Sequence, residues 1–260
     1  NHPVAPKADA CIIGPKIGSS AIWFAGGSTG SLTDSSYLLD GTDQSDFEFG
    51  SGDFTTELWF SKDSNGGDQW NNCMIAYGTD LVTGSSWKIY GGANIWGYIW
   101  SGSTAYHVTS TTNTDDNLWH HVAMTRDGTT MRLYINGVQE DTVDVTGVTM
   151  NSDGSASLYI GEDGWGAPYK GYQDEIRVSN TCRYPNGTTF TPDTTEFSSD
   201  ANTMLLVHSN TTMGSTTFTD SSSSAHTFTQ PGTGTVMHVA PKIGVGMGAF
   251  DGTGDYLVLS

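Results

Sequence analysis

A short sequence near the start of this chain is repeated near its end. Residues 15–26 read PKIGSSAIWFAG, and residues 241–252, which lie 226 positions further on, read PKIGVGMGAFDG. The two stretches agree at six of their twelve positions at one constant offset, which chance explains poorly. Self-similarity at a fixed spacing of this size indicates repeated copies of one folding unit. The sequence therefore predicts either a slice of a tandem array or a subunit whose tail completes a neighbour.

The charge of the chain excludes two classes of partner. It carries 28 acidic residues against 10 lysines and arginines, which gives a formal net charge of −18. Nucleic acids and anionic membrane surfaces both require a basic patch, so we expect neither as a partner. No apolar run approaches the length of a membrane-spanning helix, and we expect no membrane insertion.

The cysteines are few and odd in number. Cys11, Cys73 and Cys182 stand far apart, and none has the spacing of a metal-ligand motif. Three thiols cannot all pair within one chain. We expect buried free thiols, and the sequence leaves one disulfide open.

Short alternating runs, bounded by Gly, Asn, Asp and Ser, predict β-strands throughout the chain. In residues 54–60 the alternation places Phe54, Leu58 and Phe60 on one face, with Glu57 and Trp59 on the other. Residues 118–145 predict a three-stranded meander, because Asp-Gly at 127–128 and Asn-Gly at 136–137 are strong hairpin signals. Helical periodicity is nearly absent. The chain is therefore expected to be all-β, an antiparallel two-sheet β-sandwich of the jelly-roll type.

Several segments resemble one family. Residues 119–123 (WHHVA) and 133–138 (LYINGV) are similar to the central hairpin of laminin-G-like jelly rolls, within the concanavalin-A-like lectin and glucanase superfamily. Residues 158–161 (LYIG) and 171–177 (GYQDEIR) agree with the same pattern. This resemblance implies the jelly-roll sandwich, in a superfamily that includes enzymes, lectins and spacers alike.

The same resemblance suggests how the chain divides. Domains of this family open with a strand like residues 205–208 (LLVH), and their next two segments are similar to residues 218–222 (FTDSS) and 250–257 (FDGTGDYL). The resemblance implies a jelly-roll domain at residues 1–203. It also implies that residues 204–260 are the start of a second copy, or a strand-donating segment that completes a neighbouring subunit.

We do not expect an enzyme. A glucanase of this superfamily needs carboxylates in a Glu-x-Asp-x-Glu pattern on one strand, and this pattern does not occur. Glu140, Asp141 and Asp144 lack that spacing and are expected to face solvent. His120 and His121 are adjacent on a strand, so they point to opposite faces and cannot bind one ion.

Two kinds of binding site remain possible, one for calcium and one for carbohydrate. The resemblance implies that Ca²⁺, if bound, lies near Asp174, with Asp251 as a second ligand, although Ala25 occupies the corresponding position of the first copy. Glycans could stack on tryptophans in or near turns, where binding residues concentrate. The candidates for carbohydrate binding are Trp70, Trp96, Trp100 and Trp165.

The predicted role follows from the repeat and from the missing catalytic pattern. Residues 174–184 (DEIRVSNTCRY) resemble repeats in structural proteins of phages and marine viruses and in large bacterial surface proteins. We expect a non-enzymatic structural or adhesive module of a virion, such as a tail fibre or capsid-surface protein, or of an extracellular filament. It would self-associate or occur as tandem copies, outside the cell or on the virion surface. The alternative is a calcium-dependent carbohydrate-binding module for cell-surface glycans.

Overall fold

The computed structural model describes residues 12–41, 45–62, 72–78, 85–152, 156–240 and 247–248. In chain order the strands are β1 (Ile12–Ile13), β2 (Ala21–Ala25), β3 (Leu38–Asp40), β4 (Phe54–Lys62), β5 (Cys73–Gly78), β6 (Ser85–Gly91), β7 (Ile95–Ser101), β8 (Thr104–Thr109), β9 (His120–Asp127), β10 (Thr130–Ile135), β11 (Val138–Asp144), β12 (Leu158–Ile160), β13 (Lys170–Ser179), β14 (Thr203–Val207), β15 (Phe228–Thr229), β16 (Val236–Val239) and β17 (Met247–Gly248). The helical elements among these residues are short 3₁₀ turns, η1 (Ser45–Phe47) and η3 (Pro185–Gly187). None of them could span a membrane.

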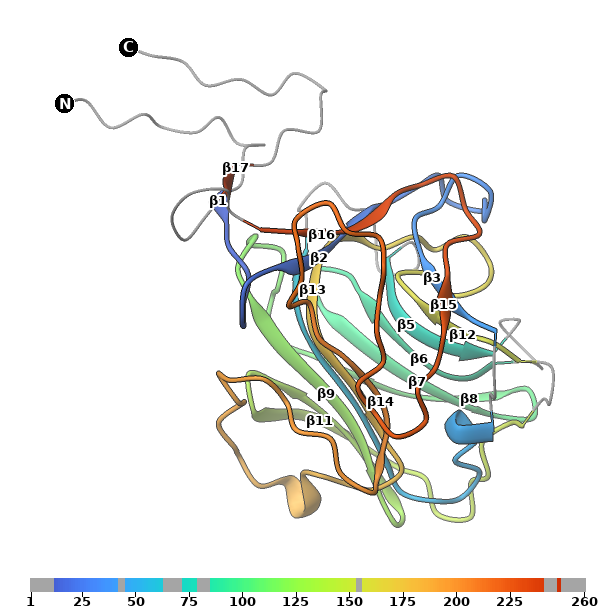
Figure 1. Cartoon of the computed structure of the whole chain (residues 1–260). Coiled ribbons are helices and arrows are strands. Elements are labelled where there is room, and N and C mark those ends of the chain that lie inside the picture. The colour runs from blue at the N-terminus through green and yellow to red at the C-terminus, as the bar shows by residue number, and fades with distance from the viewer. Residues whose placement is uncertain are drawn as a thin grey trace.

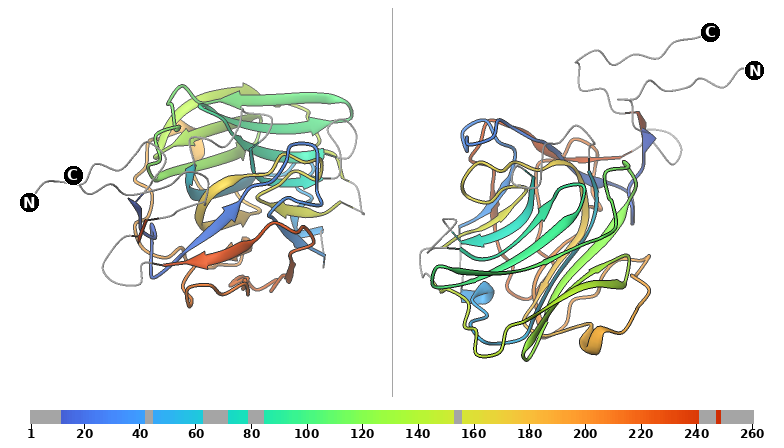
Figure 2. Two further views of the ribbon diagram at one scale, coloured as in Figure 1. Left: turned by 90° about the horizontal axis from the view of Figure 1, so that it is seen from above. Right: turned by 180° about the vertical axis from the view of Figure 1, so that it is seen from behind.

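Two antiparallel sheets pack face to face (Figures 1 and 2). The eight-stranded sheet has the order β11-β10-β9-β4-β13-β2-β16, and β14 pairs with the other half of β13. The seven-stranded sheet has the order β15-β3-β12-β5-β6-β7-β8. The predicted all-β sandwich is confirmed.

The main core lies between the sheets and follows the predicted alternation. Phe54, Leu58 and Phe60 of β4 are fully buried in it, while Glu57 and Trp59 point to the outer side of the eight-stranded sheet. Because side chains two residues apart on a strand share a face, the alternation in the β4 sequence is enough to assign both of its faces.

The predicted meander consists of β9, β10 and β11. Asn136 and Gly137 join β10 to β11 with φ angles of 52° and 81°, as the Asn-Gly hairpin signal requires. His121 lies on the outer side of the sheet beside Glu57, and His120 contacts the ring of Phe60. The two imidazoles are held by different partners.

Residues 203–239, which we call the strap, belong to the same sandwich. The strap runs from β14 to β15 and back to β16, so it adds strands to both sheets (orange to red in Figure 1). It contributes Leu205, Val207 and Val236 to the main core. Strand pairing within the chain is thus seen for residues that the sequence assigned to a second copy. Donation of the strap to a neighbour stays a prediction.

The remaining pieces lie outside the sandwich core. β1 and β17 form a two-stranded sheet beside the body of the molecule (Figure 1). Cys73 and Cys182 are free thiols, and Cys11 lies outside the described residues.

Candidate functional site

Aromatic side chains gather on the outer face of the seven-stranded sheet. Ile95 and Ile99 of β7 face the core, so Trp96, Tyr98 and Trp100 face outward. The ring centroids of Tyr98 lie 6.0 Å from Trp96 and 5.3 Å from Trp100, with near-parallel planes. This i, i+2, i+4 spacing was visible in the sequence, although Tyr98 was not among the predicted site residues.

A loop at residues 161–168 lies on the same face. The Asp163 carboxylate accepts a hydrogen bond from Tyr90 Oη at 2.7 Å and lies 3.5 Å from Lys88 Nζ. Ala167 packs with Tyr98 and Trp100. These contacts tie the loop to β6 and β7, and sequence patterns gave no signal for them because they join residues about 75 positions apart.

The carboxylate of Glu162 holds the loop together from inside. Its oxygens accept hydrogen bonds from the backbone N–H groups of Gly164, Gly166 and Ala167, and the side chain is fully buried. Burial, with the neighbouring charge of Asp163, raises the pKa of Glu162 to about 7. Its role is to brace the backbone of the loop.

Trp165 stands at the tip of this braced loop. Its side chain is 56% exposed, and it lies between Gly164 and Gly166, which have φ angles of 83° and 97°. A Cβ on Gly166 would lie 2.5 Å from Gly30 Cα, and Gly30 N–H donates to Gly166 O at 2.7 Å. The backbone that presents the indole is thus fixed by close packing on both sides.

We call Trp96, Tyr98, Trp100, His107 and Trp165 the aromatic face. The structure brings three of the four predicted tryptophans to this one side of the molecule, and Trp70 lies outside the described residues. The rings differ in access. Trp165 and His107 are exposed and Trp96 is half-buried, whereas Tyr98 and Trp100 are each only 6% exposed. Trp100 stacks beside Tyr98, and these two rings offer little surface to a ligand.

The predicted metal ligand Asp174 lies elsewhere, in the eight-stranded sheet. Its two oxygens accept backbone N–H groups of Ile17 and Glu175, each at 3.0 Å, and burial raises its pKa to about 8. No cluster of three metal-binding side chains occurs in the part of the chain that the structure describes. Asp251 lies outside that part, and calcium at Asp174 stays a prediction.

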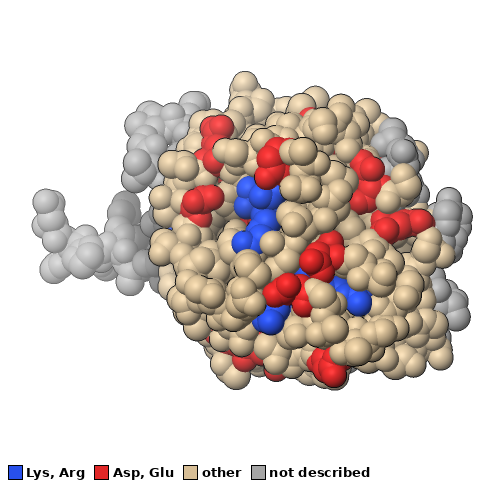
Figure 3. All heavy atoms as spheres, turned by 90° about the horizontal axis from the view of Figure 1, so that it is seen from below, with Lys and Arg blue, Asp and Glu red and all other residues tan. Residues whose placement is uncertain are grey.

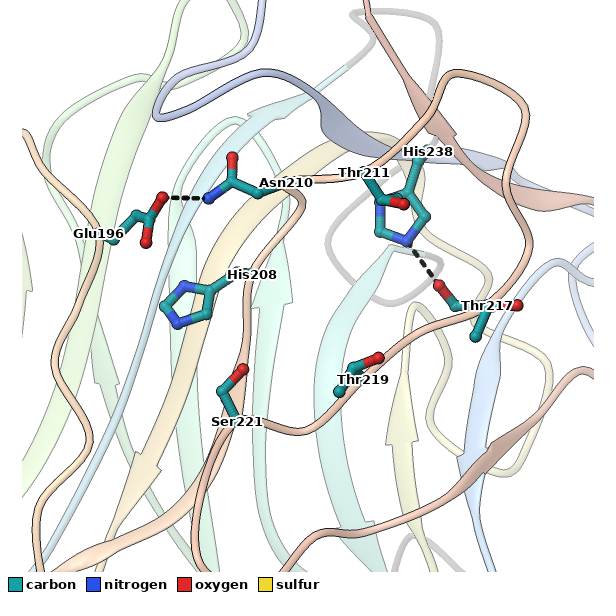
Figure 4. A pocket seen from close by; sticks show the side chains of 8 residues that line it. All are labelled: Glu196, His208, Asn210, Thr211, Thr217, Thr219, Ser221 and His238. Carbon is teal, nitrogen blue, oxygen red and sulfur yellow. Dashed lines mark hydrogen bonds between the residues drawn. The ribbon is translucent and has the colours of Figure 1, made fainter.

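The strap forms a hollow of about 330 Å³, which we call the polar pocket (Figure 4). Its walls carry hydroxyls, an amide, two imidazoles and a carboxylate, from Glu196, His208, Asn210, Thr211, Thr217, Thr219, Ser221 and His238. Both ring nitrogens of His238 are engaged, with Ser209 Oγ and Thr217 O. The pocket can hydrogen-bond a small hydrophilic molecule, but it lacks the broad aromatic surface of the other face.

Acidic and basic side chains are interspersed on part of the surface. On the face seen in Figure 3, basic side chains lie beside acidic ones and form no patch of their own. Two such pairs are Arg183 with Asp200 and Arg132 with Asp127, at 2.9 and 3.3 Å.

Comparison with solved structures shows the same fold. A protein of Bacteroides ovatus, provisionally assigned as carbohydrate-binding, has a TM-score of 0.54 at 20% identity over 87% of this chain, which spans 62% of that protein. A pentraxin of Limulus polyphemus has a TM-score of 0.43 at 12% identity, over 66% of this chain and 88% of its own. No curated protein sequence matches. Residues 33–186, more than half of the sequence, match the laminin-G-like family model, and the chain therefore belongs to the concanavalin A-like lectin/glucanase superfamily.

Proposed function

We propose that this chain is a non-enzymatic carbohydrate-binding module that holds glycans against the aromatic face. The observation that carries the proposal is the exposed indole of Trp165 on a loop braced by Glu162. Sugar rings present flat C–H faces that pack on aromatic rings, and a ring that is already fixed loses little entropy when it binds. Trp96 and His107 add further accessible ring surface on the same side.

Two observations support binding without catalysis. Glu162 has a pKa near neutrality, as a general acid would, but it is fully buried and its oxygens face backbone N–H groups. Asp163 is committed to Tyr90 and to the backbone of Trp165. The assignment of the Bacteroides ovatus protein as carbohydrate-binding points in the same direction.

A glycan array with the purified chain tests this proposal. Reproducible binding that falls at least about fivefold in Trp165→Ala is expected, since loss of a stacking ring removes about 1 kcal/mol or more. Leu118→Ala is the matched control, because Leu118 is also a large apolar side chain, 61% exposed, and does not belong to the aromatic face. Repeating the array after chelation shows whether calcium takes part.

The array also separates the aromatic face from the polar pocket. Thr219→Val removes a hydroxyl from the polar pocket and leaves the aromatic face unchanged. Binding that is lost in Thr219→Val but retained in Trp165→Ala would move the glycan site to the polar pocket. Absence of any binding would remove the carbohydrate proposal altogether.

The duplicated sequence favours a second candidate function, a structural or adhesive module of a virion surface or an extracellular filament. Repeats of one unit suit a chain that builds extended assemblies. Electron microscopy of concentrated protein tests this candidate, since regular filaments or rods are expected. A monodisperse monomer at all concentrations would contradict it.

A further inference from the structure

The strap closes one side of the sandwich and is paired entirely with strands that precede it in the chain. β14 pairs with β13, β15 with β3 and β16 with β2. Leu205, Val207 and Val236 are fully buried where the strap meets these strands. The rest of the sandwich comes from residues 21–179, so the strap and its receiving strands are two separable parts of the sequence.

Buried polar contacts fix the position of the strap on its receiving strands. His226 Nδ1 lies 2.7 Å from Asp40 Oδ2, with both side chains almost fully buried. His208 Nδ1 lies 2.8 Å from a carboxylate oxygen of Glu175. Each contact joins one group on the strap to one on the receiving strands. The same two contacts can form whether the strap belongs to the same chain as the receiving strands or to another copy.

The connection into the strap is short, polar and exposed. Residues 198–202 (SSDAN) are all exposed, directly before the buried Thr203. They are held by a turn from Thr203 N to Asp200 O and by the surface ion pair of Asp200 with Arg183. Opening this segment breaks the exposed ion pair, which is worth little, together with a few hydrogen bonds at its ends, such as that from Arg177 Nη1 to Ser198 O. Segments of this kind act as hinges in strand exchange.

The sequence after the strap resembles the segment that leads into one of its receiving strands. Residues 241–252 agree with residues 15–26 at six of twelve positions, and within β2 the shared residue is Phe24, which corresponds to Phe250. In the structure, Val236 and Val239 of β16 pair with Phe24 and Ala21 of β2. The strap thus lies between two similar segments of the chain, the first of which leads into a strand that receives it.

We propose that the strap is exchangeable, and that it docks on β2, β3 and β13 of a second copy of this chain through the pairs that it makes within its own. The self-closed and exchanged forms share the same buried contacts, so they differ mainly in connectivity and in the hinge. Concentration then decides between them. Reciprocal exchange closes a dimer, and one-way exchange builds a row of copies. This inference does not rest on glycan binding.

Disulfide trapping between two full-length variants tests the exchange. One chain carries Ala21→Cys and the other, with a mass tag, carries Val239→Cys, since these residues are register partners across β2 and β16. The two are mixed at high concentration, both as folded protein and after joint unfolding and refolding, and then oxidised. We expect a cross-linked heterodimer whose yield rises with concentration.

A matched pair in another hairpin measures random cross-linking. Arg132→Cys and Thr142→Cys are register partners across β10 and β11, where the strap takes no part, so their mixture should give no heterodimer above background. The parent chain sets that background, because it contains the free thiols of Cys73 and Cys182. The intrachain double variant Ala21→Cys/Val239→Cys shows that the strap pair can form a disulfide at all.

The exchange is supported if heterodimers form in the strap mixture and not in the control mixture. Equal yields in both mixtures, or none in the strap mixture while the intrachain double variant cross-links, overturn it. Trp23→Cys with Met237→Cys, a half-buried partner pair of the same two strands, replaces the first pair if Ala21→Cys does not fold.

Discussion

The two outer faces of the sandwich are built in opposite ways. On the eight-stranded sheet, residues 180–202 fold back over the outer side. Phe190 stacks on Tyr184 with ring centroids 3.6 Å apart, and Phe197 lies in a small apolar cluster with Trp59. On the seven-stranded sheet the aromatic face keeps Trp165, His107 and part of Trp96 open to solvent.

The charges beneath the two faces differ as well. Under residues 180–202, the fully buried Glu57 is bound by Arg177 Nε at 2.8 Å, by Tyr184 Oη at 2.6 Å and by His121 Nε2 at 3.2 Å. Burial opposes ionisation there, but these partners outweigh it and lower the pKa of Glu57 to about 2. Under the aromatic face, desolvation prevails and the pKa of Glu162 rises to about 7.

This difference between the two faces indicates that one face serves stability and the other serves binding. One face is covered by its own chain, which buries the ionic network around Glu57 and keeps that network out of reach of a ligand. The other keeps its rings accessible and uses buried carboxyls only to shape a loop. We therefore expect substitutions on the first face to change the free energy of unfolding and substitutions on the second to change affinity.

The largest effect is expected on the closed face. Glu57→Gln leaves the Arg177 guanidinium buried without its counter-charge, which should cost about 3–5 kcal/mol of unfolding free energy. Urea unfolding measures this loss. Trp165→Ala, on the open face, should stay within about 0.5 kcal/mol. Similar losses for the two variants would break the comparison.

The second prediction concerns pH. The pKa values of Glu162, about 7, and of Asp174, about 8, are raised, so their stabilising neutral forms are lost as the pH rises through 7 and 8. The pKa of Glu57 is lowered, so its contribution is lost as the pH falls toward 2. Stability should therefore peak at about pH 4, near the pKa values of unfolded carboxyls, and fall by a few kcal/mol on both sides, with the alkaline decline ending at about pH 8.

Urea midpoints across the pH range test this profile. Glu162→Gln is the informative variant, because it removes the carboxyl whose ionisation weakens the loop, and the decline between about pH 4 and pH 7 should become shallower. Stability that rises steadily from pH 6 to pH 9 would contradict the assignment.

A third, smaller effect tests the loop that presents Trp165. Gly166→Ala places a Cβ against Gly30 at a φ of 97°, which should cost about 1–3 kcal/mol and weaken glycan binding together with stability. Gly214→Ala is the matched control: its φ is 83°, but open space surrounds it. The difference in unfolding free energy between the two variants measures the cost of the contact between the new Cβ and Gly30. Equal losses would show that backbone strain alone is responsible.

The smallest effect is expected at the rim of the closed face. Asp200 pairs with Arg183 at 2.9 Å, and its side chain is 48% exposed. Asp200→Ala should therefore change the unfolding free energy by less than about 1 kcal/mol. A larger change in thermal or urea unfolding would mean that this surface pair takes part in the buried network.

Local rules predicted the parts of the fold that depend on neighbours in sequence. The Asn136-Gly137 hairpin and the two faces of β4 follow from turn chemistry and from alternation. The alternation in β7 was also sufficient to place Trp96 and Trp100 together. What it could not show is that Trp100 would be covered, because its burial depends on Ala167 and on a loop from a distant part of the chain.

Other features depend on contacts that no local pattern encodes. Asp174 and Glu175 resemble a metal-binding strand in sequence, yet the register shifts there and Glu175 takes a φ of 51°. Both carboxyls then hold backbone and strap groups from elsewhere in the chain. The family resemblance set residues 204–260 apart as the start of a second copy or a strand-donating segment, but the pairing of the strap with β13, β3 and β2 emerged only in three dimensions.

The pairing of β2 with β16 also sets an order of events during synthesis. Ala21 and Val239 are partners although they stand at opposite ends of the described sequence. A chain that leaves the ribosome from its N-terminus can form the β9–β11 meander early, from contacts close in sequence. Its eight-stranded sheet, however, stays open along β2 until the strap has been made. Completion of the sandwich therefore follows the synthesis of the strap, and until then the free edge of β2 can accept a strand from another chain.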